Sequence, residues 1–117
     1  MAYGSFEKLE VWQRACNLAV HVYEVLELCK DFGLKDQMTK AAVSIASNIA
    51  EGAERGSNLD FIRFLHFSKG SAAELRTQVY IANKIRVIGA DDQKTLTDEL
   101  KNISRMLHGL IKSLQQA

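Results

Sequence analysis

The chain has 117 residues, of which 47% are apolar and 25% are charged, a composition typical of a globular protein with one buried core. It contains no proline, so the strongest helix breaker is absent and long helices are favoured. The formal net charge is +1, which by itself gives no sign of a nucleic-acid partner. No apolar run approaches the roughly 18 residues of a membrane span and no leader pattern is present, so we expect a cytoplasmic protein.

The first predicted helix covers residues 7–32. Its main apolar stripe recurs every three or four residues from Trp12 to Cys29, as on one face of a helix. A second stripe follows at seven-residue spacing and consists of Val11, Leu18, Val25 and Phe32. Together the stripes cover about half the circumference, against roughly 100° for a surface helix. We therefore expect the second stripe to meet another subunit or a ligand, and we predict a closed cyclic homo-oligomer.

The second predicted helix covers residues 36–55, with Gly33 expected as the left-handed cap that ends the first helix. Residues 41–56, AAVSIASNIAEGAERG, are crowded with small side chains. A helix this slim lets its neighbours approach closely, so we place it at the centre of the fold. Gly56 is the candidate residue that ends it.

The third and fourth predicted helices complete the fold. Ser57 and Asp60 form a capping signal for a third helix over residues 58–88, and Gly89 ends it. Asp91 is the expected cap of a fourth helix whose leucine-rich stripe runs from Leu96 to Leu114. Short loops between long helices force antiparallel neighbours. The sequence therefore predicts an all-α, up-down-up-down four-helix bundle that forms a single domain over residues 1–117.

The residue patterns that would signal catalysis or a cofactor are missing from the sequence. A di-iron bundle needs Glu-x-x-His on two helices, and none of His21, His66 and His108 follows a glutamate in that way. His21 and Glu24 have the reversed order, on the polar side of the first helix. No glycine-rich phosphate-binding motif is present. We expect no enzymatic activity, no metal and no cofactor.

Several motifs together resemble one family. They include Gly33-Leu34-x-x-Gln37, AAVSIASNIAEG over residues 41–52, Asp60-Phe61-x-x-Phe64-Leu65 and Gly70-Ser71-x-x-Glu74-Leu75. The chain resembles the "four helix bundle protein" family, which is encoded in intervening sequences of large-subunit ribosomal RNA genes and includes the accessory variability determinant of diversity-generating retroelements. The resemblance implies a barrel-shaped homopentamer without enzymatic activity. For the retroelement branch it implies binding to nucleic acid and to a reverse transcriptase.

Four polar residues match the family motif, namely Asn48, Glu51, Arg55 and Glu74. The first three share one helical face. We expect a buried or half-buried network that ties the second helix to the third, with Arg55 paired to Glu51 or Glu74, because charges inside bundles must be paired. A ligand site or an intersubunit contact are the alternatives.

The middle of the chain is its electropositive part, because residues 35–86 carry eight basic and five acidic groups. On the third helix an arc of about 140° contains no acid and holds Tyr80 together with Arg63, His66, Lys69, Arg76 and Lys84. Repeated around a ring, this face would form a positive belt able to meet phosphates. The alternative is an ordinary solvated face, with these bases paired to Glu10, Glu24 and Glu27.

From this face and the resemblance we expect a non-enzymatic, oligomeric accessory protein that binds RNA or DNA. The alternative is a homo-oligomeric scaffold that binds a protein such as a reverse transcriptase without touching nucleic acid.

Overall fold

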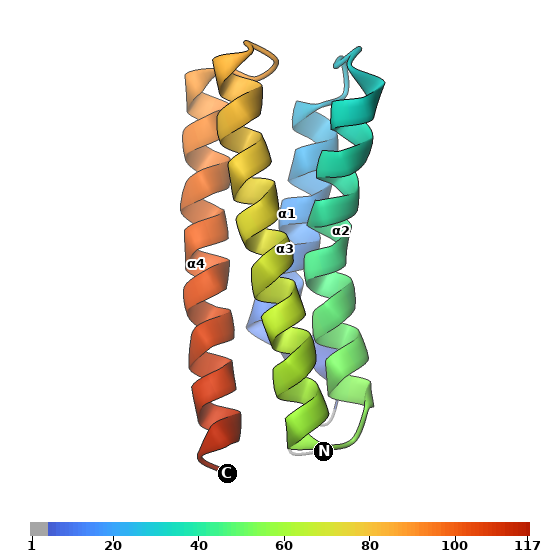
Figure 1. Ribbon diagram of the computed structural model, residues 1–117, viewed down its shortest axis with the longest axis vertical. Helices are drawn as coiled ribbons and strands as arrows, with labels where there is room; N and C mark the ends of the chain where they lie inside the picture. The colour runs from blue at the N-terminus through green and yellow to red at the C-terminus, as the bar shows by residue number, and fades with distance from the viewer. Residues whose placement is uncertain (1–4) are drawn as a thin grey trace.

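The computed structural model describes residues 5–117 and places four helices side by side, with successive helices running in opposite directions (Figure 1). The described chain contains no strand. The predicted all-α four-helix bundle is therefore confirmed. The elements are η1 (Phe6–Lys8), α1 (Glu10–Val25), α2 (Phe32–Glu54), α3 (Asn58–Lys84) and α4 (Ala90–Gln115). The sequence predicts an irregular lead-in over residues 1–6, of which residues 1–4 lie outside the described part of the chain.

The first helix is shorter at both ends than predicted. At its start Ser5 accepts a hydrogen bond from the Glu7 backbone N–H, which caps a short 3-10 turn before α1. At its end α1 stops at Val25, and Gly33 lies in the first turn of α2. The expected role of Gly33 as a helix-ending cap is therefore wrong. The Asp31 side chain accepts from the Leu34 N–H at 3.1 Å, so an aspartate N-cap starts the second helix there.

The turn between α2 and α3 follows the prediction. Gly56 has a φ of +86°, which a residue with a side chain seldom adopts. Ser57 Oγ accepts from the Asp60 N–H at 3.1 Å and caps α3.

The turn between α3 and α4 differs from the prediction. Helix α3 stops at Lys84, earlier than expected, and the chain turns through Arg86 at a φ of 66°. Gly89, not Asp91, occupies the N-cap position of α4.

Helices that follow one another in the chain pack together, and α4 also packs on α1. In the described chain no Cα of α1 lies within 8 Å of a Cα of α3, and the same holds for α2 and α4, so these two pairs are the diagonals of the bundle. The α2–α3 contact is the most extensive, and the α1–α4 contact is the loosest of the helix pairs. The close α2–α3 contact follows from Gly52, since a Cβ there would lie 2.6 Å from the Phe64 Cβ.

The second apolar stripe of α1 does not form a surplus surface. Val11 and Leu18 are 4% and 2% exposed and belong to the core of the single bundle, and Val25 packs partly buried against that core. Phe32 is 72% exposed and belongs to α2. The expectation that the lone bundle leaves Val11 and Leu18 unburied is wrong, because both side chains pack in the core of the same chain.

Candidate nucleic-acid interface

The basic residues predicted to contact phosphates all lie on α3, but in different surroundings. His66 and Lys84 are exposed, whereas Lys69 and Arg76 are half-buried. Asn58, on the same flank as Arg76, donates to the Leu114 carbonyl of α4 at 3.4 Å. This flank therefore faces α4. Within the described chain these four side chains have no carboxylate within 4 Å.

Arg63 differs from the other four. Its guanidinium lies 3.4 Å from Asp60 Oδ1 and 5.2 Å from the centre of the Phe64 ring. Asp60 therefore offsets much of the charge of Arg63, although the pair is exposed and weak. Arg63 belongs to the end of the bundle near the α2–α3 turn and contributes least free positive charge to the face.

The acids of α1 do not neutralise this face. Glu10 lies 3.6 Å from Arg14 of its own helix, and α1 lies diagonally across the bundle from α3, with no Cα–Cα distance within 8 Å among the described residues. Glu24 makes no ion pair within 4 Å among the described residues, and neither does Glu27. The alternative in which Glu10, Glu24 and Glu27 pair with the bases of α3 is therefore wrong.

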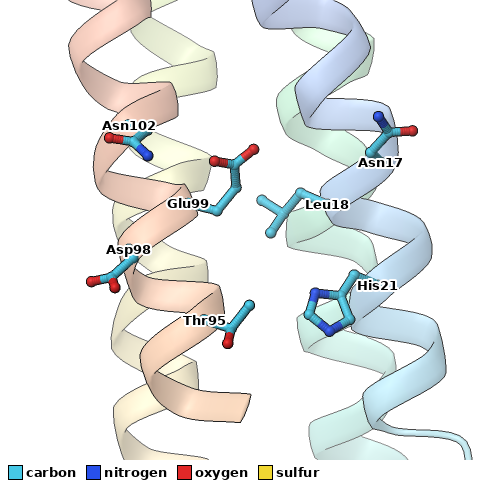
Figure 2. Close-up of a pocket in the computed structure, with 7 residues that line it drawn as sticks. All are labelled: Asn17, Leu18, His21, Thr95, Asp98, Glu99 and Asn102. Atoms are coloured by element: carbon cyan, nitrogen blue, oxygen red, sulfur yellow. The ribbon is translucent and has the colours of Figure 1, made fainter. Parts of the chain in front are cut away.

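Acidic and polar side chains gather instead in a cleft of about 450 Å³ between α1 and α4. In Figure 2 Leu18 and Glu99 lean toward each other across this cleft, and Asp98 points away from α1. Glu99 accepts from Arg14 Nε at 3.2 Å. The hydrogen bond from Lys94 at 2.8 Å lowers the pKa of Asp98, so this carboxylate is negative at neutral pH. Each of the two carboxylates of the cleft is therefore paired with a basic side chain. It is lined by Asn17, Leu18, His21, Thr95, Asp98, Glu99 and Asn102.

The expected polar network is divided into separate parts. Asn48 Nδ2 donates to both the carbonyl and the Oγ of Ser44 at 2.9 Å, and Ser44 Oγ shares a hydrogen bond of 2.9 Å with Ser71 Oγ of α3. Ser68, fully buried, donates to the Ile45 carbonyl at 2.7 Å. Asn48 and these serines therefore tie α2 to α3. The cross-helix role of the serines was not predicted, because serine also packs well in helices and its sequence position does not reveal its partner.

The charged members of the expected network lie at the surface. Arg55 pairs with Glu51 at 3.2 Å, one turn away on the same helix, and its guanidinium lies 4.7 Å from the centre of the Phe64 ring. The predicted Arg55–Glu51 pairing is confirmed, but both side chains are exposed. Glu74 is also exposed and lines a cleft of about 320 Å³ between α2 and α3, away from Arg55. The predicted burial of these charges is wrong.

An apolar cleft of about 430 Å³ lies between α1 and α2. Its floor is formed by small residues of α2, and Val43 at its rim is 43% exposed. Burial raises the pKa of the Cys16 thiol in its wall, so this thiol is mostly neutral. The cleft is lined by Phe6, Trp12, Cys16, Ala19, Val43, Ala46, Ser47 and Ala50.

Three further exposed apolar side chains lie on α3 at two levels, because Phe67 is about 20 Å along the helix from Ile81 and Ile85. Phe67, Ile81 and Ile85 are 50%, 47% and 54% exposed. The Phe67 ring packs edge-to-face on Phe64, with 5.3 Å between the ring centres.

The described residues offer neither a grouped set of metal ligands nor a helix suited to a membrane. Over residues 5–117 no three His, Cys, Asp or Glu side chains are grouped so that they could hold a metal ion. None of the helices there has the length and apolar character needed to cross a bilayer.

Comparison with known proteins identifies the family. The model for the "23S rRNA-intervening sequence protein" matches residues 7–109. The chain belongs to this family. A crystal structure of a protein of unknown function from the S23 ribosomal protein family of Bacteroides thetaiotaomicron superposes on this 23S rRNA-intervening sequence protein with a TM-score of 0.81. The two chains are 24% identical, and the alignment covers 87% of this chain and 98% of the other. No curated protein matches the sequence significantly.

The structural match shows that this 23S rRNA-intervening sequence protein shares the four-helix fold of that S23 family member. At 24% identity the likeness concerns the backbone. The surfaces of this chain must therefore be interpreted from its own side chains.

Proposed function

We propose that this chain is a non-enzymatic, oligomeric nucleic-acid-binding protein, and that His66, Lys69, Arg76 and Lys84 of α3 contact phosphates. The observation that carries this proposal is the separation of charge around the bundle. These four side chains have no carboxylate within 4 Å in the described chain. Glu99 of the α1–α4 cleft lies on the flank of α4 that faces α1, where it pairs with Arg14. Arg63 adds a weaker contact because Asp60 pairs with it.

Binding through such a face depends on contacts to phosphates and not on contacts to nucleobases. Affinity should therefore be nearly independent of nucleotide sequence and should fall steeply with salt, because counterions are released when the phosphates are neutralised. An oligomer that repeats this face increases the affinity further, since one nucleic-acid chain can meet several copies.

The experiment is a titration of fluorescently labelled RNA and DNA at about 50 and 200 mM salt, concentrations between which phosphate-driven binding weakens strongly. Wild type is compared with a Lys69→Gln/Arg76→Gln/Lys84→Gln variant. The matched control is Lys8→Gln/Lys30→Gln/Lys40→Gln, which removes the same charge from exposed positions outside α3. We expect the first variant to lose most of the low-salt affinity and the control to retain it. Absence of wild-type binding at low salt, or equal losses in both variants, would contradict the proposal.

We also propose that the protein assembles with itself. Two exposed apolar surfaces favour this self-association. One surface is the α1–α2 cleft with Val43 at its rim, and the other is formed by Ile81 and Ile85, one helical turn apart on α3. Two different patches on one copy suit head-to-tail contacts, and such contacts close into a ring when the rotation between copies allows it. A pentamer is the size implied by the family resemblance.

Head-to-tail assembly has a direct test. Val43→Glu and Ile81→Glu each place a charge in one patch, at positions that are 43% and 47% exposed, so the bundle itself should still fold. Each variant alone should be monomeric by light scattering. An equimolar mixture should form dimers, because each variant keeps the patch that the other lacks. A monomeric wild type, or a mixture that stays monomeric, would contradict head-to-tail assembly.

The alternative function is a scaffold that binds a protein such as a reverse transcriptase without nucleic-acid contact. Such a scaffold would bind its partner through the same apolar surfaces, and the basic side chains of α3 would simply be solvated. The nucleic-acid titration separates the two functions, because a pure scaffold binds neither RNA nor DNA at low salt.

A further inference from the structure

The basic side chains of α3 form only one side of a surface shared with α4. We infer that Lys101, Arg105 and Lys112 of α4 form a second row of phosphate contacts, and that the groove between α3 and α4 binds a single-stranded nucleic acid. This inference rests on the proposed nucleic-acid binding and names the class of nucleic acid.

The charges of α4 are sorted onto two flanks. Glu99 and Met106 both contact Arg14, so they mark the flank of α4 that faces α1. At about 100° per residue the basic residues of α4 lie within an arc of about 60°, centred about 140° away from that flank. This arc faces solvent, on the side of α4 that is nearer to α3 than to α1. It contains Lys94, Lys101, Arg105, His108 and Lys112.

The relative register of the two helices places the basic side chains of α3 at the same levels as those of α4. At one end Asn58 donates to the Leu114 carbonyl at 3.4 Å, and at the other end α3 stops at Lys84 just before α4 begins at Ala90. Both helices rise about 1.5 Å per residue, so Lys69 lies level with about Arg105. Lys101 then lies between the levels of Lys69 and Arg76.

The carboxylates near this groove are already engaged or lie elsewhere. Asp98, at the edge of the basic arc, binds Lys94 at 2.8 Å. Asp60 pairs with Arg63 at 3.4 Å, and Glu74 lines the α2–α3 cleft. Among the described residues Lys101, Arg105 and Lys112 have no carboxylate within 4 Å, although Arg105 donates a hydrogen bond to Asn102. The groove is therefore basic on both sides.

Tyr80 indicates which nucleic acid fits. It is 39% exposed and lies one helical turn from both Arg76 and Lys84 on the α4 flank of α3. Proteins that bind single strands combine a basic groove along the backbone with aromatic rings on which unpaired bases stack. Helices in contact lie about 8–10 Å apart, so the two rows can contact one phosphate backbone from both sides while a base stacks on Tyr80.

The test compares a Lys101→Gln/Arg105→Gln/Lys112→Gln variant with the Lys8→Gln/Lys30→Gln/Lys40→Gln control, using a labelled single-stranded RNA and a duplex of equal length. Loss of three phosphate contacts should reduce the steepness of the log affinity against log salt plot by about 2 and weaken low-salt binding on the order of tenfold. Tyr80→Ala should weaken single-strand binding on the order of tenfold, and Tyr80→Phe should retain it, because a phenyl ring still stacks. Circular dichroism checks that each variant is folded.

The outcomes separate this inference from the proposed function. If wild type binds no nucleic acid, the proposed function itself fails. If wild type binds and the α3 variant loses binding, but the α4 variant behaves like the control, only the second row is wrong. Duplex binding as tight as single-strand binding, with Tyr80→Ala unchanged, would overturn the single-strand assignment. Weaker binding in both the α4 variant and Tyr80→Ala, with preference for the single strand, is the result that the inference predicts.

Discussion

Gly52 of α2 and Phe64 of α3 lie so close together that a Cβ on Gly52 would be 2.6 Å from the Phe64 Cβ. Real Cβ atoms do not approach each other at this distance, so only glycine fits without moving a helix. Both residues belong to motifs that carry the family resemblance. The contact explains why the α2–α3 pair is the most extensively packed in the bundle.

This contact predicts opposite effects of the same substitution at two helical glycines. Gly52→Ala should lower the free energy of unfolding by about 1–3 kcal/mol, because it overpacks the α2–α3 contact. Gly70→Ala should raise it by about 0.5–1 kcal/mol, since alanine is the better helix former and a Cβ there would have no neighbour within 4 Å. Urea unfolding of the two variants and wild type measures both changes. A stabilising Gly52→Ala would contradict the packing described here.

The fold was predictable because its signals are local. The capping pair Ser57 and Asp60 and the leucine-rich stripe of α4 depend only on residues close in sequence. The start of α2 was missed for a related reason. Gly33 can end one helix or lie in the first turn of the next, and the Asp31 cap decides between these alternatives.

The surroundings of side chains were less predictable, because helical spacing identifies a shared face but not the helix that covers it. Val11 and Leu18 were assigned to an oligomer interface, yet both belong to the core of the single bundle. Arg55 and Glu74 were expected in one network, yet Arg55 lies beside Phe64 near the α2–α3 turn, whereas Glu74 lines a cleft with Lys40 further along the two helices. The missing information was how each helix is rotated and how far it is shifted along its axis relative to its neighbours.

The surface position of Arg55 predicts a small contribution to stability. Its pair with Glu51 is exposed, and its contact with the Phe64 ring is a surface cation–π interaction. Arg55→Ala should therefore lower the free energy of unfolding by about 0.5–1 kcal/mol. Lys112→Ala, which removes an exposed side chain without an ion pair within 4 Å in the described chain, is the matched control and should change it by less. Thermal unfolding of both variants provides the comparison, and a loss above about 3 kcal/mol for Arg55→Ala would indicate a buried charge.

Cys16 reports whether the α1–α2 cleft is covered by another copy. Because burial raises the pKa of its thiol, Cys16 should react slowly with iodoacetamide at pH 8 even in the monomer. Assembly through the cleft should slow the reaction further as protein concentration rises. Cys29, in the loop between α1 and α2, is the internal control and should react at a constant rate. A Cys16 rate that is independent of concentration across the assembly range would exclude this cleft as the contact.

The most direct test of nucleic-acid binding by α3 is lysine acetylation of wild type with and without a single-stranded RNA, followed by mass spectrometry of each lysine. We predict that bound RNA slows acetylation of Lys69 and Lys84, whose positive charges are buried against phosphates. Acetylation of Lys8, Lys30 and Lys40 should be unchanged, because these side chains lie outside α3. Protection of this second set, or no protection of Lys69 and Lys84 at RNA concentrations that saturate binding, would contradict the account.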